Sequence, residues 1–393
     1  MPRFAAGILA ASVVLAAAAL RVRGGPPADP RVATSRPADW PMHRGGPALR
    51  GVADGKLRVP LKLRWRFKAG DMLKSSPVVA GGRVFVGSDD GHVVCLALAD
   101  GKPQWRYKTP DAIEATPCVI DGSVFVGSSD GVLYALDAAT GRLRWRYKTG
   151  DRILAGANGT RGPEGRSLRI VVGSYDNRLH CVDAATGKGL WTYSTDNFIN
   201  GTPAVAGGQA VFGGCDAVVH VVSLADGRAV RRIEAGAYIA GSAAVAGGRA
   251  YVGHYEGELL AADLQTGKIV WRQSRETPFF SSPAVDDRNV VVGCRDKRLY
   301  CFARADGTRR WSFAARDAID SSPVICDGKV VVGADDGRLY VLDLADGKRL
   351  WEYQIGEAVT TSPAIVDGLV LVSADDGYVY AFANTTGTNA KHE

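Results

Sequence analysis

The sequence predicts an all-β protein, an eight-bladed β-propeller of four-stranded antiparallel blades. Three observations lead to this prediction: tryptophans recur about every 40 residues, each interval holds four short apolar runs, and the first run of the chain has no partner until the last copy. The chain has 48 Gly and 18 Pro in 393 residues, which fits many short strands joined by tight turns better than long helices.

Seven tryptophans mark the repeat. The interval between Trp145 and Trp191 is longer than the others because of an insertion, Gly159 to Arg166, which we expect to lengthen one hairpin. The double interval between Trp191 and Trp271 contains Arg231, which stands where the tryptophan of that copy is expected. Counting Arg231, the chain holds eight copies. The seven tryptophans are Trp65, Trp105, Trp145, Trp191, Trp271, Trp311 and Trp351.

Each copy contains four runs rich in Val, Tyr and Phe. Runs of this length that are bounded by Gly and Asp are typical of strands. In one copy they are residues 117–120, 124–127, 133–137 and 145–148. The pair Asp121-Gly122 lies between the first two runs, and Asp-Gly is a preferred pair for a tight hairpin turn. Four antiparallel strands per copy make one blade of a propeller.

The order of the runs predicts how the ring closes. The first copy begins with its tryptophan run, Leu63 to Lys68, whereas the last copy ends with Tyr378 to Phe382 and has no tryptophan run after it. We therefore expect the first run to complete the last blade as its outer strand. Closure of this kind removes the open ends that a linear array of repeats would have to cap.

The outer strand of each blade has a structural reason for its composition. Trp145 follows the turn 138–141, so its indole is expected to dock between neighbouring blades and to bury about 150–250 Å². The alternation Trp145, Arg146, Tyr147, Lys148 places cations on one face of the strand. Cations on an outer strand hinder pairing with other chains, so they require no ligand to explain them.

The N-terminal segment predicts export. One cation, Arg3, precedes an apolar run from Phe4 to Leu20, as in a secretory signal. Arg21 and Arg23 follow at once, so both a cleaved signal peptide and an uncleaved anchor are consistent with the sequence. The first cysteine is Cys95, which excludes lipid attachment to a cysteine near the N-terminus. We expect a periplasmic or otherwise extracytoplasmic location.

The sequence predicts five parts in the chain: residues 1–23 signal peptide or signal anchor, 24–38 disordered spacer, 39–62 lead-in segment, 63–383 propeller, and 384–393 disordered tail.

Seven cysteines show no paired framework, because their number is odd and their spacing irregular. Cys95, Cys181 and Cys301 occupy one repeat position, where other copies have Ala or Val, and this favours a role in packing. The net charge of +7 is spread over all repeats, so a nucleic-acid partner is not indicated. The remaining cysteines are Cys118, Cys215, Cys294 and Cys326.

The run Ala135-Leu136-Asp137-Ala138-Ala139-Thr140-Gly141 with Trp145 recurs as residues 182–187 with Trp191 and as residues 262–267 with Trp271. It resembles the tryptophan-docking motif of PQQ-like propellers, a superfamily that contains quinoprotein dehydrogenases and non-catalytic BamB-like envelope proteins. The resemblance covers Leu63 to about Ala383. The segment Asp39-Trp40-Pro41-Met42-His43-Arg44-Gly45 is similar to the lead-in of many exported members.

The resemblance implies two functions that can be weighed against the residues. Quinoprotein dehydrogenases hold the quinone between a tryptophan floor and a disulfide of adjacent cysteines, with calcium beside it. In this chain no two cysteines are adjacent, seven tryptophans sit at docking positions, and Trp40 precedes the propeller. A C-x-x-C-H haem motif is also missing. We therefore expect no enzyme activity and no cofactor, with a PQQ- and calcium-dependent oxidoreductase as the alternative.

The central funnel holds the candidates for a small ligand. The residue just before the Ser-Pro or Thr-Pro strand is expected at the inner end of its blade, facing the axis. Two acids, one amide and one Lys at this position could hold calcium or a small polar ligand, or they could line a wet channel. Across the copies these residues are Lys74, Glu114, Ala155, Asn200, Ala240, Phe280, Asp320 and Thr360.

Other motifs have structural explanations. His180 and His220 occupy the repeat position of Tyr134 and Tyr340, so we expect them to be packing residues. Acidic turns such as Asp335-Asp336-Gly337 recur at hairpin ends, which favours turn chemistry over calcium loops.

The expected function is a non-catalytic binding or scaffolding propeller that presents loops to an envelope or secreted protein partner as a monomer; a sensor that binds a small ligand in the funnel is a further alternative. A direct role in outer-membrane assembly is in doubt, because the chain lacks the lipid-attachment Cys of the lipoprotein members. Positions that break the repeat are the candidates for interaction. They are Arg161, Glu164, Arg231, Tyr238, Phe279 and Phe280.

Overall fold

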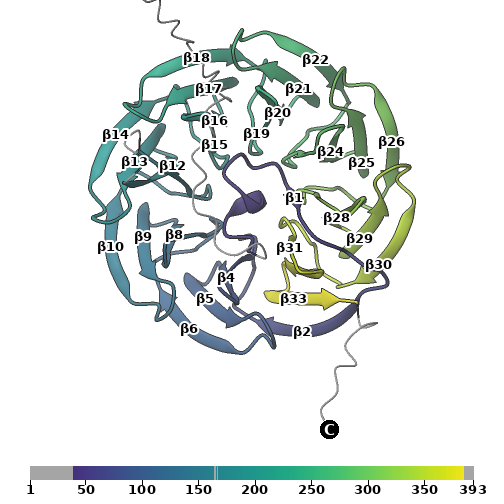
Figure 1. The fold of residues 1–393 in the computed structure, drawn as a ribbon, viewed down its shortest axis with the longest axis horizontal. Helices are drawn as coiled ribbons and strands as arrows, with labels where there is room; N and C mark the ends of the chain where they lie inside the picture. Colours follow the sequence, from purple (N-terminus) through teal and green to yellow (C-terminus); the bar gives the residue numbers. More distant parts are fainter. Residues whose placement is uncertain (1–38, 163–164, 166, 385–393) are drawn as a thin grey trace, which may run out of the picture. The chain divides into compact units, whose positions relative to one another are not determined.

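The computed structural model describes residues 39–162, 165 and 167–384, and it contains the eight predicted blades arranged in a ring (Figure 1). Every blade is a four-stranded antiparallel sheet, and one blade carries a fifth, parallel strand at its inner edge. The predicted fold class is therefore confirmed. The predicted signal segment, the spacer and nearly all of the C-terminal tail lie outside the described residues.

Each blade is built from four strands, which are named in order from the innermost to the outermost. Blade 1 is β3 (Val78–Ala80), β4 (Arg83–Gly87), β5 (His92–Ala97) and β6 (Pro103–Lys108); blade 2 is β7 (Cys118–Ile120), β8 (Ser123–Gly127), β9 (Val132–Asp137) and β10 (Leu143–Lys148); blade 3 is β11 (Asn158–Arg161), β12 (Leu168–Ser174), β13 (Arg178–Asp183) and β14 (Gly189–Ser194); blade 4 is β15 (Ala204–Ala206), β16 (Gln209–Gly213), β17 (Val218–Ser223) and β18 (Ala229–Glu234).

The second half of the ring follows the same pattern. Blade 5 is β19 (Ala244–Ala246), β20 (Arg249–Gly253), β21 (Glu258–Asp263) and β22 (Ile269–Ser274); blade 6 is β23 (Ala284–Val285), β24 (Asn289–Cys294), β25 (Arg298–Ala303) and β26 (Arg309–Ala314); blade 7 is β27 (Val324–Cys326), β28 (Lys329–Ala334), β29 (Arg338–Asp343) and β30 (Arg349–Gln354); blade 8 is β31 (Ala364–Val366), β32 (Leu369–Ser373), β33 (Tyr378–Ala383) and β2 (Lys62–Lys68).

The burial of each strand follows its place in the blade. β8 is buried along its whole length and β9 is buried in its middle, because both faces of these strands pack against neighbouring blades. The outer strand β10 alternates between half-buried and exposed residues, so only one of its faces is covered. In the hairpin between β7 and β8, Asp121 and Gly122 both have positive φ, as a tight I′-type turn requires.

The ring closes as predicted. β2 pairs antiparallel with β33, from Lys62 opposite Ala383 to Lys68 opposite Tyr378, with a bulge between Leu63 and Trp65. The N-terminal part of the propeller thus supplies the outer strand of the blade that the C-terminal part begins. In Figure 1 the purple β2 lies beside the yellow β33.

The tryptophans dock between blades. The Trp311 indole Nε1 donates to the Leu344 carbonyl of the next blade at 2.8 Å, and the ring lies against Gly347. A Cβ at Gly347 would be only 2.6 Å from the indole, and its φ of +74° is one that other residues rarely adopt. In blade 4, Arg231 takes the place of the indole: its side chain packs on Gly267 and donates to the Thr266 carbonyl at 3.5 Å.

The lead-in segment crosses the ring near the axis, on the face that carries the turns between the first and second strands of the blades (Figure 1). Sequence reasoning did not predict this feature. It contains the short 3₁₀ helix η1 (His43–Gly45) and β1 (Val52–Ala53), which pairs parallel with β27. Its backbone groups bond to the innermost strands of seven successive blades. Its partners are Val79, Val119, Asn158, Val205, Val245, Val285 and Ile325.

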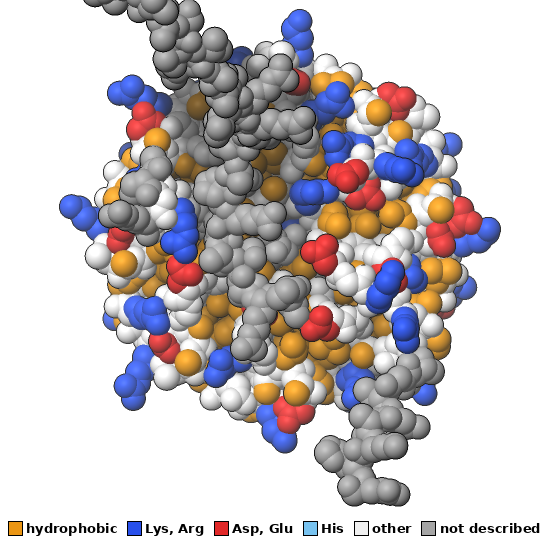
Figure 2. Space-filling view, in the orientation of Figure 1, with side chains coloured by type: hydrophobic (Ala, Val, Ile, Leu, Met, Phe, Trp, Pro, Cys, Tyr) orange, Lys and Arg blue, Asp and Glu red, His pale blue; other side chains and the backbone are white. Residues whose placement is uncertain are grey.

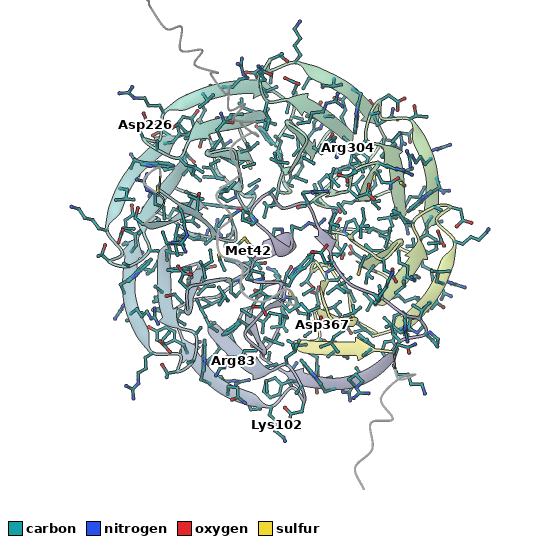
Figure 3. The ribbon with its side chains drawn as sticks, in the orientation of Figure 1. Met42, Arg83, Lys102, Asp226, Arg304 and Asp367 are labelled. Atoms are coloured by element: carbon teal, nitrogen blue, oxygen red, sulfur yellow. The ribbon has the colours of Figure 1, made fainter. Side chains whose placement is uncertain are left out.

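Figure 3 shows how this face is arranged: Met42 of the lead-in lies near the axis, whereas Lys102 and Asp226, which belong to outer turns, lie at the rim. Lys and Arg side chains stand at intervals around the rim in Figure 2, as the spread of cations over the repeats predicts. The described part of the chain has no helix with the length and apolar character needed to cross a membrane.

The cysteines are packing residues. Six of the seven are buried and Cys215 is half-buried. Cys95, Cys181 and Cys301 each lie opposite the tryptophan of the adjacent outer strand, which confirms their predicted role. Burial raises the pKa of these three thiols to about 12, so they are protonated at neutral pH.

Trp311→Ala should lower the free energy of unfolding by about 3–5 kcal/mol, because it removes a largely buried indole, its hydrogen bond and its contact with the next blade. Urea unfolding followed by circular dichroism measures this loss. Arg309→Ala, at an exposed position on the same strand, is the control and should change stability by less than about 0.5 kcal/mol. Equal effects of the two substitutions would contradict the docking role.

Candidate functional site

A cavity of about 190 Å³ lies at the centre of the ring. The inner strand of each blade runs from a loop near this cavity to a hairpin turn on the lead-in face, so the loops and the lead-in lie at opposite ends of the channel. His43 of the lead-in forms part of the cavity wall. The loop ends of the blades form the mouth of the funnel.

The predicted funnel residues lie largely where expected. Lys74, Glu114, Asn200, Ala240, Phe280 and Thr360 all line the cavity. In blade 3 the repeat position of Glu114 belongs to Leu154, and Ala155 is one residue further along; both line the cavity, so the alignment of that copy was wrong by one residue. Asp320 is not part of the cavity wall.

Lys74 joins two carboxylates at the mouth. Its ammonium nitrogen lies 3.2 Å from Glu114 of the next blade and 3.7 Å from Asp89 of its own blade. Burial opposes the charge on Lys74, but the two carboxylates outweigh it and raise the pKa of Lys74. For Asp89, burial is the main cause of a raised pKa. Its Oδ1 atom has no hydrogen-bond partner among the described residues.

Asp320 is turned toward Arg295 of blade 6, whose guanidinium donates to both of its carboxylate oxygens at 2.7–3.2 Å. Beside this pair lies Asp335, whose pKa burial raises to about 6, with a further contribution from the negative charge of Asp320. The Asp335 Oδ1 atom is buried without a partner in the part of the chain that the structure describes. Sequence reasoning missed Arg295 and assigned Asp335 only to a turn, because both residues follow the second strand of their blades.

The mouth has a polar side and an apolar side. Blades 7, 8, 1 and 2 contribute carboxylates, including Asp375, which the Thr360 hydroxyl contacts at 3.5 Å. Blades 3 to 6 contribute Leu154, Ala240 and Phe280, with one amide, Asn200, whose Nδ2 lies 2.9 Å from the Cys215 sulfur. This asymmetry was not apparent from the funnel position alone.

Aromatic side chains surround the apolar side of the mouth; we name them the aromatic arc. Tyr255 lies 4.7 Å from Phe280 and 6.4 Å from Tyr238, measured between ring centroids. Tyr175 and Phe198 are stacked at 4.8 Å. Tyr238 is 53% exposed, Tyr255 44% and Phe198 41%, although large aromatic side chains are usually covered.

The other interaction candidates have different environments. Arg161 lies on β11, in the hairpin that the insertion lengthens, 3.4 Å from Asp121. Glu164 lies outside the described residues. Phe279 is fully buried in the core between blades 5 and 6, so its expected role on the surface was wrong, whereas its neighbour Phe280 reaches the cavity.

His180 and His220 are packing residues, as predicted. Each imidazole Nε2 bonds to an aspartate four residues earlier, Asp176 or Asp216, at 2.9–3.0 Å. Each Nδ1 meets a tyrosine hydroxyl of the outer strand at 3.0 Å. Burial lowers the pKa of His180, an effect that the nearby Asp176 partly offsets.

The residues present do not fit a calcium–quinone site. The carboxylates of Glu114 and Asp320 are each paired with a cation, Lys74 or Arg295. Within the described ranges, no three His, Cys, Asp or Glu side chains are grouped so that they could hold a metal ion. The docking tryptophans lie on outer strands, and Trp40, in the lead-in, pairs with Val79 of an inner strand, so none forms a floor for a planar cofactor.

The repeat, the docked indoles and the closed eight-bladed ring define a propeller of the PQQ-like repeat class. A family model described as outer membrane protein assembly factor BamB matches residues 62–164, 155–230, 215–362 and 295–390, and the chain belongs to this family. No curated protein matches the sequence.

Three solved structures share the fold. BamB from Moraxella catarrhalis superposes with a TM-score of 0.70 at 21% identity, covering 85% of this chain and 100% of that one. The computationally designed Ika8 protein gives 0.71 at 18% identity, covering 82% and 100%. A europium-containing methanol dehydrogenase gives 0.71 at 14% identity, covering 88% and 98%. Because non-catalytic and catalytic propellers share one fold, these likenesses describe architecture and not activity.

Asp335→Asn should become more stable relative to the wild type as the pH rises from about 4 to about 6. The folded protein holds the Asp335 proton up to a pKa of about 6, whereas the unfolded chain loses it near 3.8, so the stability that this group contributes is lost as the pH rises through this range. The variant should gain about 1 kcal/mol at pH 7, since water screens this half-buried group.

Urea unfolding of both proteins at a series of pH values provides the measurement. Asp287→Asn, at a side chain that is 92% exposed, is the matched control and should leave the pH profile unchanged. A profile for Asp335→Asn that parallels the wild type would show that this carboxyl is not desolvated.

Proposed function

We propose that this protein is a non-catalytic, extracytoplasmic scaffolding propeller of the BamB type, which binds a protein partner of the cell envelope through the mouth of its funnel. The observation that carries the proposal is the aromatic arc. The family model is described as an outer membrane protein assembly factor, which supports a partner among envelope proteins.

The aromatic arc has the composition of a binding surface. Aromatic residues are enriched at the centres of protein interfaces, where they bury much area at a low cost in conformational entropy. Tyr238, Tyr255 and Phe280 form one continuous group, and the guanidinium of Arg295 lies 4.4 Å from the Phe280 ring. Arginine beside exposed aromatic rings is a frequent composition of binding hot spots.

The partner surface should be apolar at its centre and basic on one side. The aromatic arc would cover the apolar part. The neighbouring carboxylates Asp375, Asp89 and Asp335 have raised pKa values, and a cation from the partner would stabilise their charged forms.

The double substitution Tyr238→Ser with Tyr255→Ser should weaken partner binding at least about tenfold, because it removes two exposed rings from the centre of the surface. Cross-linking from a photoreactive residue at position 198, followed by mass spectrometry, identifies the partner, and titration with that partner measures affinity. Val270→Ser, at a position of blade 5 that is 40% exposed on the outer strand, is the control and should bind normally. If the double variant bound the partner with unchanged affinity, the aromatic arc would not be the binding surface.

Titration with PQQ, with and without calcium, separates the scaffold from the oxidoreductase. Because the residues at the mouth do not fit a quinone site, we expect no change in tryptophan fluorescence and no substrate-dependent dye reduction at high micromolar PQQ. Calcium-dependent binding together with alcohol- or sugar-dependent dye reduction would overturn the proposal. Glu114, Asn200 and Asp320 would then be the first residues to substitute.

A further inference from the structure

Seven side-chain hydroxyls form a ring around the central cavity, and we name it the hydroxyl ring. Each belongs to the residue that precedes the proline or small residue at the start of an inner strand, one from every blade except blade 3, where Gly156 occupies the position. All seven line the cavity. They are Ser76, Thr116, Thr202, Ser242, Ser282, Ser322 and Ser362.

The acceptor side of these hydroxyls is occupied. Backbone N–H groups of one blade donate to the hydroxyl oxygen of the next blade, for example from Ser242 to Ser282 and from Ser282 to Ser322, both at 2.9 Å. Six of the seven hydroxyls accept a backbone N–H in this way, and Ser362 accepts from a side chain instead. This arrangement joins the blades at the axis.

The donor side of the hydroxyl ring is almost unused. Only the Ser362 hydroxyl donates to a protein group among the described residues, the Ser322 carbonyl at 3.2 Å. A serine or threonine hydroxyl can donate one hydrogen bond in addition to those it accepts. The other six hydroxyls therefore have a hydrogen available for whatever occupies the cavity that they line.

Arg44 places a positive charge beside the hydroxyl ring. It lies on η1 of the lead-in, is 1% exposed, and donates from Nη1 to the Ser362 hydroxyl at 2.9 Å. Nε and Nη2 have no partner in the described chain, and no described carboxylate forms an ion pair with this guanidinium. His43, the preceding residue, lines the cavity, and its Nδ1 is buried and also without a partner in that part of the chain.

A buried charge without a counter-charge is unusual. Transfer of an isolated ion from water into a protein interior is strongly unfavourable, and buried charges are as a rule paired. A guanidinium cannot reduce this cost by losing its proton at physiological pH. An anion beside Arg44 and the free hydroxyl hydrogens would satisfy both the charge and the unused donors.

We propose that the inner end of the funnel, which the hydroxyl ring and His43 line and which Arg44 adjoins through Ser362, is a binding site for a small oxyanion, a carboxylate or a phosphate group. Ser362, which accepts from Arg44, marks the sector of the ring beside this charge, and Ser322 and Ser76 are its hydrogen-bonded neighbours. A cavity of about 190 Å³ holds such a group together with several waters. Of the carboxylates at the mouth, Glu114 also lines the cavity, but it is paired with Lys74, as Asp320 is with Arg295.

The site is distinct from the surface proposed for the protein partner. The aromatic arc surrounds the mouth, and of its members only Phe280 lines the cavity, whereas the hydroxyl ring lines the cavity together with His43 of the lead-in. Binding of an oxyanion would also hold the lead-in against the blades, because Arg44 belongs to the segment that closes this end of the channel.

The test is calorimetric titration of the purified full chain with inorganic phosphate and, separately, with formate, at constant ionic strength balanced with chloride. Phosphate is tetrahedral and formate is a planar carboxylate, so comparing the two affinities shows which kind of oxyanion the site prefers. We expect one of them to bind with a millimolar or lower Kd. Arg44→Met should weaken that binding at least about tenfold, because it removes the charge and keeps the length of the side chain.

Arg50→Met is the matched control. Arg50 lies on the same lead-in segment, and its guanidinium contacts the Val285 carbonyl and Asp287 at the surface, away from the hydroxyl ring. This variant should bind the anion as the wild type does. An equal loss in both variants would mean that the effect comes from a loosened lead-in, and it would overturn the proposed site.

A second measurement does not depend on a folded Arg44 variant. Crystals of the wild-type protein grown with selenate should show an anomalous peak between the Ser322 and Ser362 hydroxyls. Absence of binding of either anion up to tens of millimolar, or a channel that contains water only in the selenate crystals, would overturn the proposal.

Discussion

Both faces of each blade are apolar, and this constraint organises the whole structure. A sheet with two apolar faces needs a neighbour on either side, so the row of blades is stable only when it returns to its start. Pairing of β2 with β33 makes this return, and it joins residues that are more than 300 positions apart in the chain. Docked indoles at the rim and the hydroxyl ring at the axis link neighbouring blades, with Arg231 in place of the indole in blade 4 and no hydroxyl in blade 3.

The candidate functional sites lie where the repeated blades leave side chains without partners. At the mouth, the repeat places one side chain per blade around the axis, and these side chains vary freely because the strands do not need them. Aromatic rings collect over blades 3 to 6 and carboxylates over the remaining blades. At the other end, the lead-in closes the channel and brings Arg44 beside hydroxyls whose oxygens already serve the joins between blades. One end therefore presents a surface, and the other a charged interior.

The candidate site was predicted only in part. Lys74, Glu114, Asn200, Phe280 and Thr360 line the cavity as expected, because the strand repeat determines which residues face the axis. The one-residue error at Ala155 arose because blade 3 has Gly156-Ala157 where most copies have the Ser-Pro or Thr-Pro pair that marks the start of the strand. The pairing of Asp320 with Arg295 and the burial of Phe279 depend on the packing of neighbouring blades, which a single repeat does not encode.

The sequence by itself determined the number of blades, the strands of each, the closing strand and the docking tryptophans, because each of these is a local pattern repeated at one period. Tertiary structure alone decided how residues without a repeat are used. The lead-in occurs once, so no period reveals that its backbone bonds to seven blades or that the buried Arg44 reaches the Ser362 hydroxyl. The asymmetry of the mouth likewise arises only when side chains from eight separate loops come together around one axis.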